Sequence, residues 1–567
     1  MPKSCRSLIE SLERRRLLAS TFAETSALAE AADRSVAGGF SATINFQPES
    51  LGSVDNTRAD FGRPFGVRGN GLSYGWSRDL EAAGDVVDRD TTRDLYSLTE
   101  SRAVGNGPAS ERQDIDERYD TVALPEPGDT WSIDVPDGRT YALAVVVGDP
   151  DFGDPGAGGP VESETFIDVN GERFIRAELR AYWPYAEVVG YVEPGPDGRI
   201  TLDFNARNVE ARLLWVRVTE VEPLPTYETG EPINWQQIGG VPATDINVPT
   251  SPVVRAEGGA VRLGDEFFFF GGYTQAYVDV HDQIDRLDLT DGTRQEEVRT
   301  LPDGVSETHA TFAADEARGL IYMAGGQLGI TPDTAPQDIR DEVYAFDPNA
   351  GNGGVFTQLP DLPEGRTAAI SFVHGDRLHV LGGGNELGVL TQVTHWSLDL
   401  VDAVDNGNSE AEWEVMPPLP FAVNHSAVHV VPGAAPSGGD LAVVVMGEYD
   451  HNFGYSGRQQ IQRYDFDAAS WSLGQLSPVP LSHINTAFDG ERIWSVGGQR
   501  RGNFVGDDVF SYDVAEDRWR IHTSAAQPRK VGSLVYDDEE DRLLYIAGDS
   551  RDEGFMSDAL VGEIDRS

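Results

Sequence analysis

A short apolar run that ends at glycine recurs six times in the second half of the chain. The spacing between copies is 50 to 65 residues, which indicates a repeat architecture. Each run reads as a strand buried on both faces, and the glycines let the chain bend where neighbouring sheets crowd. The copies are "EFFFFGGY" (266–273), "GLIYMAGGQ" (319–327), "DRLHVLGGGN" (376–385), "LAVVVMGEY" (441–449), "ERIWSVGGQ" (491–499) and "RLLYIAGDS" (542–550).

The remainder of each repeat is also regular. An alternating strand follows the glycines, as in "QIQRYDFDA" and "DDVFSYDVA", and a tryptophan comes later. Tyr464 precedes Trp471 by seven positions, and Tyr512 precedes Trp519 by the same distance. A proline-bearing turn closes the unit. This order resembles kelch repeats, and the resemblance implies a six-bladed kelch β-propeller over residues 233–567.

The two ends of this segment are expected to meet. After Gly548 only one more strand is readable, "DALVGEID", which leaves the sixth blade one strand short. Before the first repeat stands "INWQQIGGVP" (233–242), which has the pattern of an outermost strand. We expect it to complete the sixth blade, because a closed ring leaves no unpaired edge that could template aggregation.

The first folded segment, residues 41–223, reads as a β-sandwich. "TWSIDVPDGRTYALAVVVGDPD" has a turn at Pro136-Asp137-Gly138, and "ETFIDVNGERF" has the strong hairpin signal Asn170-Gly171. Two further alternating strands follow, without helical periods. "INFQPE", "GLSYGWSRD", "DVNGE" and "DGRITLDF" resemble segments of the malectin-like, galactose-binding-like jelly-roll modules of exported bacterial proteins.

That resemblance implies carbohydrate binding through aromatic side chains, because a sugar presents an apolar face that stacks on a ring. "GLSYGW" can alternatively be a strand end that faces the core. "AYWPYAE" is expected to be an exposed loop, because its proline interrupts any central strand. The candidate residues are Tyr74, Trp76, Asp79, Tyr182, Trp183 and Tyr185.

Residues 1–40 are expected to be a leader and a linker. "LIESLERRRLLA" (8–19) resembles a short leader of exported bacterial surface proteins, which implies a secreted or cell-surface bacterial protein; the alternative is an amphipathic helix without a targeting role. The only cysteine, Cys5, lies in this segment, so no intrachain disulfide or thiolate metal cluster is expected. Residues 224–232 are expected to be a short, semi-stiff linker.

The composition limits the partners. Acidic side chains outnumber basic ones 94 to 44, for a formal net charge of −50. Such a field argues against nucleic acid and against an anionic membrane surface. No apolar run approaches the roughly 18 residues of a membrane span. We expect a self-repelling, monomeric protein whose partner is a carbohydrate or glycoconjugate, or another surface protein.

Two acidic clusters offer the hard oxygen ligands that calcium needs. Solvated acidic loops are the preferred explanation of both clusters over structural calcium, and the prediction is that the protein has no cofactor. The clusters are Asp85, Asp88, Asp90 and Asp94, and Asp149, Asp151 and Asp154.

Two sets of polar residues are expected to face the propeller channel, where ligands of such folds bind. One set follows the glycine motifs and the other precedes the innermost strands. They either bind a polyhydroxylated ligand or hydrogen-bond neighbouring blades and channel water. The first set is Tyr273, Gln327, Asn385, Glu448, Gln499 and Asp549, and the second is His309, Arg366, His425, His483 and Arg529.

The fourth glycine motif differs from the others, because Glu448 stands where three of its counterparts, Gln327, Asn385 and Gln499, have an amide. The sequence assigns no catalytic residue. If this loop overhangs the channel, Glu448 could act as a general base, with His451 or Arg366 polarising a sugar oxygen.

Two kelch enzyme families bear on this idea. Galactose oxidase also joins a sugar-binding sandwich to a kelch propeller, but its copper radical needs a tyrosine crosslinked to a cysteine, and Cys5 lies in the leader. Sialic acid (N-acetylneuraminate) mutarotases have six kelch blades, yet none of their local motifs is found here.

The sequence therefore predicts an all-β protein with an N-terminal jelly-roll β-sandwich followed by a six-bladed kelch β-propeller. The function it favours is an exported or cell-surface binding protein. The sandwich would bind glycan, and the propeller would bind glycan or protein. Whether the protein is an enzyme stays open; the alternative is a carbohydrate-active kelch enzyme, such as a sialic acid mutarotase or epimerase.

Overall fold

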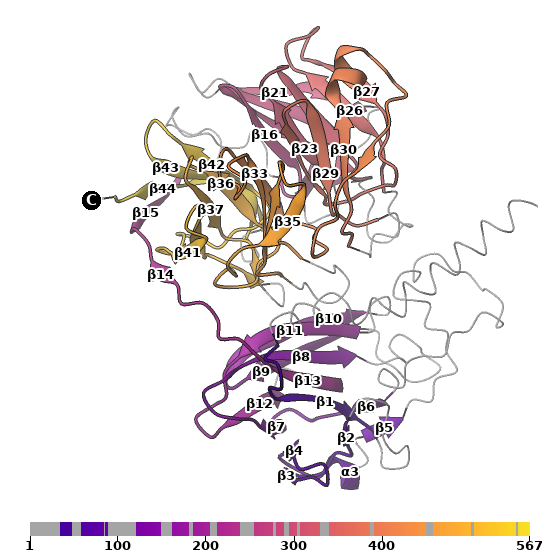
Figure 1. Ribbon diagram of the computed structural model, residues 1–567, viewed down its shortest axis with the longest axis vertical. Coiled ribbons are helices and arrows are strands. Elements are labelled where there is room, and N and C mark those ends of the chain that lie inside the picture. The colour runs from indigo at the N-terminus through magenta and orange to yellow at the C-terminus, as the bar shows by residue number, and fades with distance from the viewer. Residues whose placement is uncertain are drawn as a thin grey trace, which may run out of the picture. The chain divides into compact units, whose positions relative to one another are not determined.

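The computed structural model describes residues 35–47, 58–83, 86–88, 121–148, 162–180, 185–204, 212–238, 255–275, 279–288, 294–302, 307–328, 339–385, 391–448, 457–500, 504–550 and 554–566. The chain divides into two compact units, one up to Leu224 and one from Pro225 (Figure 1). In the part of the chain that the structure describes, both units are built mainly of β-strands, with the short helical elements α3 (Leu80–Ala83) and η5 (Val401–Asp405). Among the described residues, no helix has the length and hydropathy of a membrane span.

Two sheets make up the first unit, and all their pairings are antiparallel except that of β1 with β2. One has the order β11 (Tyr185–Val192), β8 (Thr140–Gly148), β13 (Leu213–Val221), β1 (Ser41–Phe46), β2 (Arg58–Asp60), with β6 (Thr121–Ala123) on β13 and β5 (Val86–Asp88) on β6. The other has the order β10 (Glu172–Arg180), β9 (Glu162–Val169), β12 (Arg199–Phe204), β7 (Thr130–Asp134), β4 (Ser73–Trp76), β3 (Gly66–Val67).

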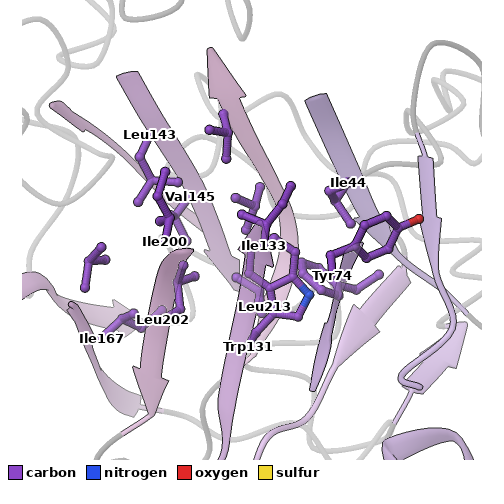
Figure 2. Packing of buried hydrophobic residues seen from close by; sticks show 14 of the residues in the cluster. Ile44, Tyr74, Trp131, Ile133, Leu143, Val145, Ile167, Ile200, Leu202 and Leu213 are labelled. Atoms are coloured by element: carbon purple, nitrogen blue, oxygen red, sulfur yellow. The ribbon is translucent and has the colours of Figure 1, made fainter. Parts of the chain in front are cut away.

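The two sheets share one apolar core, to which Leu143 and Val145 contribute from one sheet and Ile200 and Leu202 from the other (Figure 2). The Asn170-Gly171 turn forms the predicted hairpin, because β9 pairs with β10 through it. The turn at 136–138 does not form a hairpin: β7 and β8 belong to different sheets, so the chain passes from one layer to the other there.

The second unit consists of six antiparallel sheets, each with four strands in a meander. In chain order, they are β16 (Gly259–Leu263), β17 (Glu266–Phe270), β20 (Gln283–Asp288), β21 (Arg294–Thr300); β23 (Thr311–Asp315), β24 (Leu320–Ala324), β26 (Val343–Asp347), β27 (Val355–Leu359); β28 (Ile370–His374), β29 (Arg377–Leu381), β30 (His395–Asp399), β31 (Glu414–Val415); β32 (Ala427–Val431), β33 (Leu441–Val445), β34 (Ile461–Asp465), β35 (Ser470–Leu473); β36 (Asn485–Phe488), β37 (Arg492–Val496), β40 (Val509–Asp513), β41 (Arg518–Ile521); and β42 (Ser533–Asp537), β43 (Arg542–Ser550), β44 (Gly554–Ile564), β15 (Ile233–Ile238).

Short strands extend this pattern. β14 (Glu228–Thr229) lies parallel to β41 at the edge of the fifth sheet. Three two-strand pairs follow the glycine motifs: β18 (Tyr273–Gln275) with β19 (Asp279–Val280), β25 (Gln327–Leu328) with β22 (Glu307–Thr308), and β38 (Gln499–Arg500) with β39 (Phe504–Val505).

The four consecutive phenylalanines of β17 point alternately to two neighbouring sheets. Phe268 and Phe270 pack in a cluster with residues of the second sheet, and Phe267 and Phe269 pack in a cluster with residues of the sixth. Successive side chains of a strand point to opposite faces, so a strand covered on both sides needs apolar residues at every position. The sixth sheet is therefore a neighbour of the first.

The sixth sheet closes the series, as predicted from the sequence. β15 pairs antiparallel with β44 over its whole length, from Ile233 opposite Ile564 to Ile238 opposite Ala559 (Figure 1). The sheet thus takes one strand from the start of the unit and three from its end.

Five of the six glycine motifs join their sheet to the next. The N–H of the second glycine donates to a backbone carbonyl of the following sheet. A Cβ at the first position would approach that carbonyl; at Gly497 it would lie 2.1 Å from the Arg529 oxygen. In the fourth and sixth sheets, Met446 and Ala547 replace the first glycine, and there the hydrogen bond from the second glycine to that carbonyl is longer. The lengths are 2.7 Å (Gly326–Arg366), 2.8 Å (Gly383–Val423), 2.7 Å (Gly498–Arg529), 3.0 Å (Gly447–Leu481) and 3.3 Å (Gly548–Arg255).

Replacing Gly497 with alanine is therefore expected to destabilise the second unit by roughly 2–3 kcal/mol more than replacing Gly490. Both glycines have positive φ, 67° and 97°, so both substitutions incur a backbone cost of about 1 kcal/mol. A Cβ at Gly490 meets nothing within 4 Å, so the difference isolates the clash with Arg529. Urea unfolding of the two variants measures it, and equal losses would contradict this account of the glycine pair.

Candidate functional site

Six residues, one before the first strand of each sheet, form a closed ring of backbone hydrogen bonds, hereafter the axial ring. Each has a left-handed φ between 44° and 59°. Each N–H donates to the carbonyl of the ring residue in the preceding sheet, at 2.9 to 3.4 Å, and the first residue closes the circle by donating to the last. Side chains from all six sheets therefore gather about one axis. The ring is Glu257, His309, Ala368, His425, His483 and Val531.

A second layer of polar side chains lies directly beside the ring. The residue before each ring residue forms an antiparallel bridge with the residue that follows the glycine motif. These bridges bring the residues after the glycines to the axis, as the sequence predicted for five of the six. The bridges are Ala256–Tyr273, Thr308–Gln327, Thr367–Gly384, Asn424–Glu448, Ser482–Gln499 and Lys530–Asp549.

Carboxylates and imidazoles contact one another at the axis, and we call the five residues involved the axial cluster. Glu257 Oε2 lies 3.0 Å from His309 Nε2, and Glu448 Oε1 lies 3.2 Å from His425 Nδ1. His483 lies between the two acids, with Nε2 3.9 Å from Glu257 Oε1 and Nδ1 3.8 Å from Glu448 Oε2. The His425 and His483 rings stack, with centroids 3.8 Å apart.

The three imidazoles are oriented by the residues that precede them. The Nδ1 atoms of His309, His425 and His483 lie 2.8 to 3.0 Å from the side-chain oxygens of Thr308, Asn424 and Ser482, respectively. A short polar residue followed by histidine, in "THA", "NHS" and "SHI", is thus the sequence signature of this arrangement.

The charges in the cluster are fixed by burial and by mutual contact. Burial opposes the charged form of Glu257, but its contact with His309, with Lys530 nearby, outweighs burial and holds the pKa of Glu257 well below the usual value. Burial, helped by the neighbouring His425, lowers the pKa of His483 well below its usual value. At neutral pH, Glu257 is therefore an anion and His483 is neutral.

Other predicted channel residues hydrogen-bond neighbouring sheets. Gln327 Oε1 accepts from Thr367 Oγ1 at 3.1 Å, and Gln499 Oε1 accepts from Lys530 Nζ at 2.7 Å. Burial raises the pKa of Tyr273, helped by the negative charge of Glu257.

Arg366 and Arg529 do not occupy the axial ring; they lie two residues before it, and Ala368 and Val531 hold the ring positions. The Arg366 side chain is buried over the Trp396 ring, 4.4 Å from its centroid, and Arg529 pairs with Asp558 at 2.8 Å. Asn385 follows Gly384, which holds the bridging position in the third sheet. His451 lies outside the described residues.

The sequence reasoning missed Glu257 and Lys530. Glu257 stands in "RAEGGAV" at the position that the histidines occupy in "ETHATF" and "LSHINT", so aligning the starts of the innermost strands would have found it. The predicted set held only histidines and arginines, so the carboxylate at the equivalent position was passed over.

In the first unit, Tyr74 and Trp76 are each 1% exposed and belong to the core shown in Figure 2, so neither ring can stack on a sugar. Their spacing of two on β4 puts both on the inward face. Asp79 accepts from the N–H of Ala82 in α3. Tyr185 begins β11, while Tyr182 and Trp183 lie outside the described residues, as do the acidic clusters apart from the backbone of Asp88.

The axial cluster leaves little free space within the described residues. The side chains of Glu257, His309 and His425 are 9%, 9% and 10% exposed, those of His483 and Glu448 2% and 0%. A crevice beside Glu257 and His309 is too small to hold a water molecule. A sugar-sized ligand would contact the exposed edges of the cluster and would not enter it.

Repeated four-stranded sheets joined around one ring define the second unit as a β-propeller, and its similarities to known proteins support the kelch type. No family model matches the sequence. A kelch repeat-containing protein of Arabidopsis thaliana is 27% identical over 190 residues, 33% of this chain and 41% of that protein. The Kelch-like protein terF of Aspergillus terreus is 24% identical over 310 residues, 53% of this chain and 61% of that protein.

The chain thus spans about half the length of these curated relatives. A solved structure titled "Structure of YjhT" is 16% identical, with a TM-score of 0.44, and the match covers 56% of this chain and 97% of that one.

Proposed function

We propose that the protein is an exported, cell-surface carbohydrate-binding protein with two modules. The second unit is a six-bladed kelch propeller that holds a polyhydroxylated ligand over the axial cluster. The first unit is a jelly-roll module of the malectin-like, galactose-binding-like class that binds glycan separately. The leader-like segment at 8–19 supports export.

One observation carries the proposal for the propeller. The backbone hydrogen bonds of the axial ring involve no side chain, and Ala368 and Val531 make them at two of its positions as the polar residues do at theirs. Closing the ring therefore needs no carboxylate and no imidazole. Four polar ring residues plus Glu448 gather there, although burying such groups costs free energy. Binding of a polar ligand explains why these polar side chains are present, whereas closure of the ring does not.

The chemistry of the cluster suits hydroxyl groups. An ionised Glu257 accepts hydrogen bonds from hydroxyls, and the neutral imidazole of His483 both donates and accepts. In the first unit, with Tyr74 and Trp76 in the core, "AYWPYAE" (181–187) is the remaining aromatic candidate for stacking on a sugar.

A glycan array probed with the full chain, followed by calorimetry on the best ligand, tests this function. Replacing Glu257 with glutamine is expected to weaken propeller binding about 10-fold, because a charged hydrogen-bond acceptor is lost. Glu364→Gln is the matched control, since this acid is 40% exposed and pairs with Arg366 away from the ring. Trp183→Ala tests the sandwich site separately. Failure of every glycan to bind would overturn the proposal.

A second candidate function is a sugar-acting enzyme, such as an epimerase or mutarotase. The observation that favours it is the pairing of carboxylate with imidazole, Glu448 with His425 and Glu257 with His309, because such pairs perform general acid–base catalysis. Exchange between sugar anomers, followed by NMR with the parent chain and with Glu448→Gln, tests it. Equal exchange rates in the two would remove this candidate.

A further inference from the structure

We propose that His425, Glu448 and His483 bind a divalent transition-metal ion at the axis of the propeller. One imidazole nitrogen from each histidine and one carboxylate oxygen lie within 4.8 Å of one another. The three residues come from the fourth and fifth sheets, and their side chains are 10%, 0% and 2% exposed, respectively.

The donor set selects the class of ion. Two imidazoles with one carboxylate suit zinc and neighbouring first-row metals, whereas calcium and magnesium prefer oxygen ligands alone. Three protein ligands leave at least one coordination position open, which is the arrangement of sites that hold water or a ligand oxygen.

The distances are close to those required. Ligands about 2.1 Å from a tetrahedral ion are separated from one another by about 3.4 Å. His425 Nδ1 lies 3.2 Å from Glu448 Oε1, and His483 Nδ1 lies 3.8 Å from Glu448 Oε2. The two imidazole planes are 17° apart, so one ion cannot lie in the plane of both rings. Binding therefore requires the His483 ring to turn about its Cβ–Cγ bond, which opens the stack.

The surroundings hold the ligands in place. His425 and His483 belong to the axial ring, so their backbones are fixed by neighbouring sheets. Glu448 is fixed by its bridge to Asn424. Asn424 and Ser482 contact the same Nδ1 atoms of His425 and His483 that face Glu448, so an ion bound at Nδ1 replaces these two hydrogen bonds. The negative field of the whole protein, with its formal charge of −50, draws cations toward the chain.

His309 provides a matched control within the same ring. It has the same left-handed backbone and a short polar residue before it, and its ring packs edge-on against His425, but its Nε2 faces Glu257 and it is not part of the three-residue group. Replacing it changes one ring histidine without removing a proposed ligand.

The test is a titration of the chelator-stripped full chain with zinc, in excess calcium so that exposed acidic groups are occupied. We expect one zinc ion per chain. His425→Ala and Glu448→Gln should each weaken binding on the order of 100-fold, at the upper end of what the loss of an outer-shell partner costs. His309→Ala should keep one ion per chain and weaken its affinity far less, because His309 contacts His425 only ring against ring. Absence of saturable binding, or equal affinity in parent and Glu448→Gln, would overturn the proposal.

Cobalt(II) absorption on the unmutated chain gives a second measurement that does not depend on folding of a variant. Intense visible bands are expected for a low-coordinate nitrogen and oxygen site, and a spectrum of six-coordinate, water-like cobalt would contradict it. None of these measurements uses a carbohydrate, so they can succeed or fail separately from the proposed function.

Discussion

Deletion of Ile233–Ile238 is expected to unfold the whole second unit. These six residues form β15, which pairs with β44 at every position and supplies the fourth strand of the sixth sheet. Ile233 is 3% exposed and packs in the cluster that joins the fifth and sixth sheets. Each buried backbone group left unpaired costs about 1–3 kcal/mol, so several of them equal the 5–15 kcal/mol that stabilises an ordinary domain.

Circular dichroism during heating, with limited proteolysis, measures the outcome. The deletion should remove the transition of the second unit and leave that of the first. In the control variant, Glu228 and Thr229 of β14 are both replaced with glycine. This strand adds to the edge of the fifth sheet, and Glu228 lies 3.3 Å from an exposed Arg518, so only a small loss is expected. A deletion variant that melts like its parent would disprove closure by β15.

Mild acid is expected to destabilise the second unit because of two buried histidines in the third sheet. His379 Nδ1 lies 2.9 Å from His395 Nε2, among the rings of Phe372, Tyr464 and Trp471. Burial lowers the pKa of His379 to about 2 and that of His395 to about 4.

The unfolded chain binds these two protons near pH 6.5 and the folded chain does not, so stability falls as the pH drops below 6.5. At pH 5 the loss is about 2 kcal/mol per histidine. Urea unfolding between pH 7 and pH 5 measures it. The double variant His379→Gln/His395→Gln keeps hydrogen-bonding groups without titrating, and its stability should vary less with pH. A slope equal to that of the parent would refute this assignment.

Mild acid should stabilise the first unit, whereas it destabilises the second. Asp60 is buried, and although Trp131 and the Gly62 N–H hydrogen-bond to its carboxylate, burial raises its pKa to about 6. A raised pKa means that the folded state holds the proton more tightly, so the first unit gains stability as the pH falls from about 6 to 4. Asp60→Asn should abolish that gain. The β15 deletion identifies which melting transition belongs to which unit.

Repeats and closure were readable in the sequence because both depend on local pattern. An apolar run buried on two faces must be apolar at every position, and glycine is needed where Gly497 meets the Arg529 carbonyl. The last repeat has only three strands at the end of the chain, so β44 needed a partner, and "INWQQI" has the pattern of that missing outer strand.

The candidate site was less predictable, because backbone geometry decides which residue before each first strand occupies the axial ring. Arg366 and Arg529 precede their strands much as the histidines do, but the residue with positive φ lies two positions further along. In the first unit, the pattern of β4 shows that Tyr74 and Trp76 share a face, but not whether that face is the core or the solvent. Only the packing of two sheets decides it.

The axial ring separates the framework of the propeller from its chemistry. Because the hydrogen bonds that close the ring are all between main-chain atoms, glutamate, alanine, valine and three histidines all occupy its positions. Evolution or a protein engineer can therefore exchange these six side chains one at a time, and install new ligands or new specificity, while the scaffold that presents them stays intact.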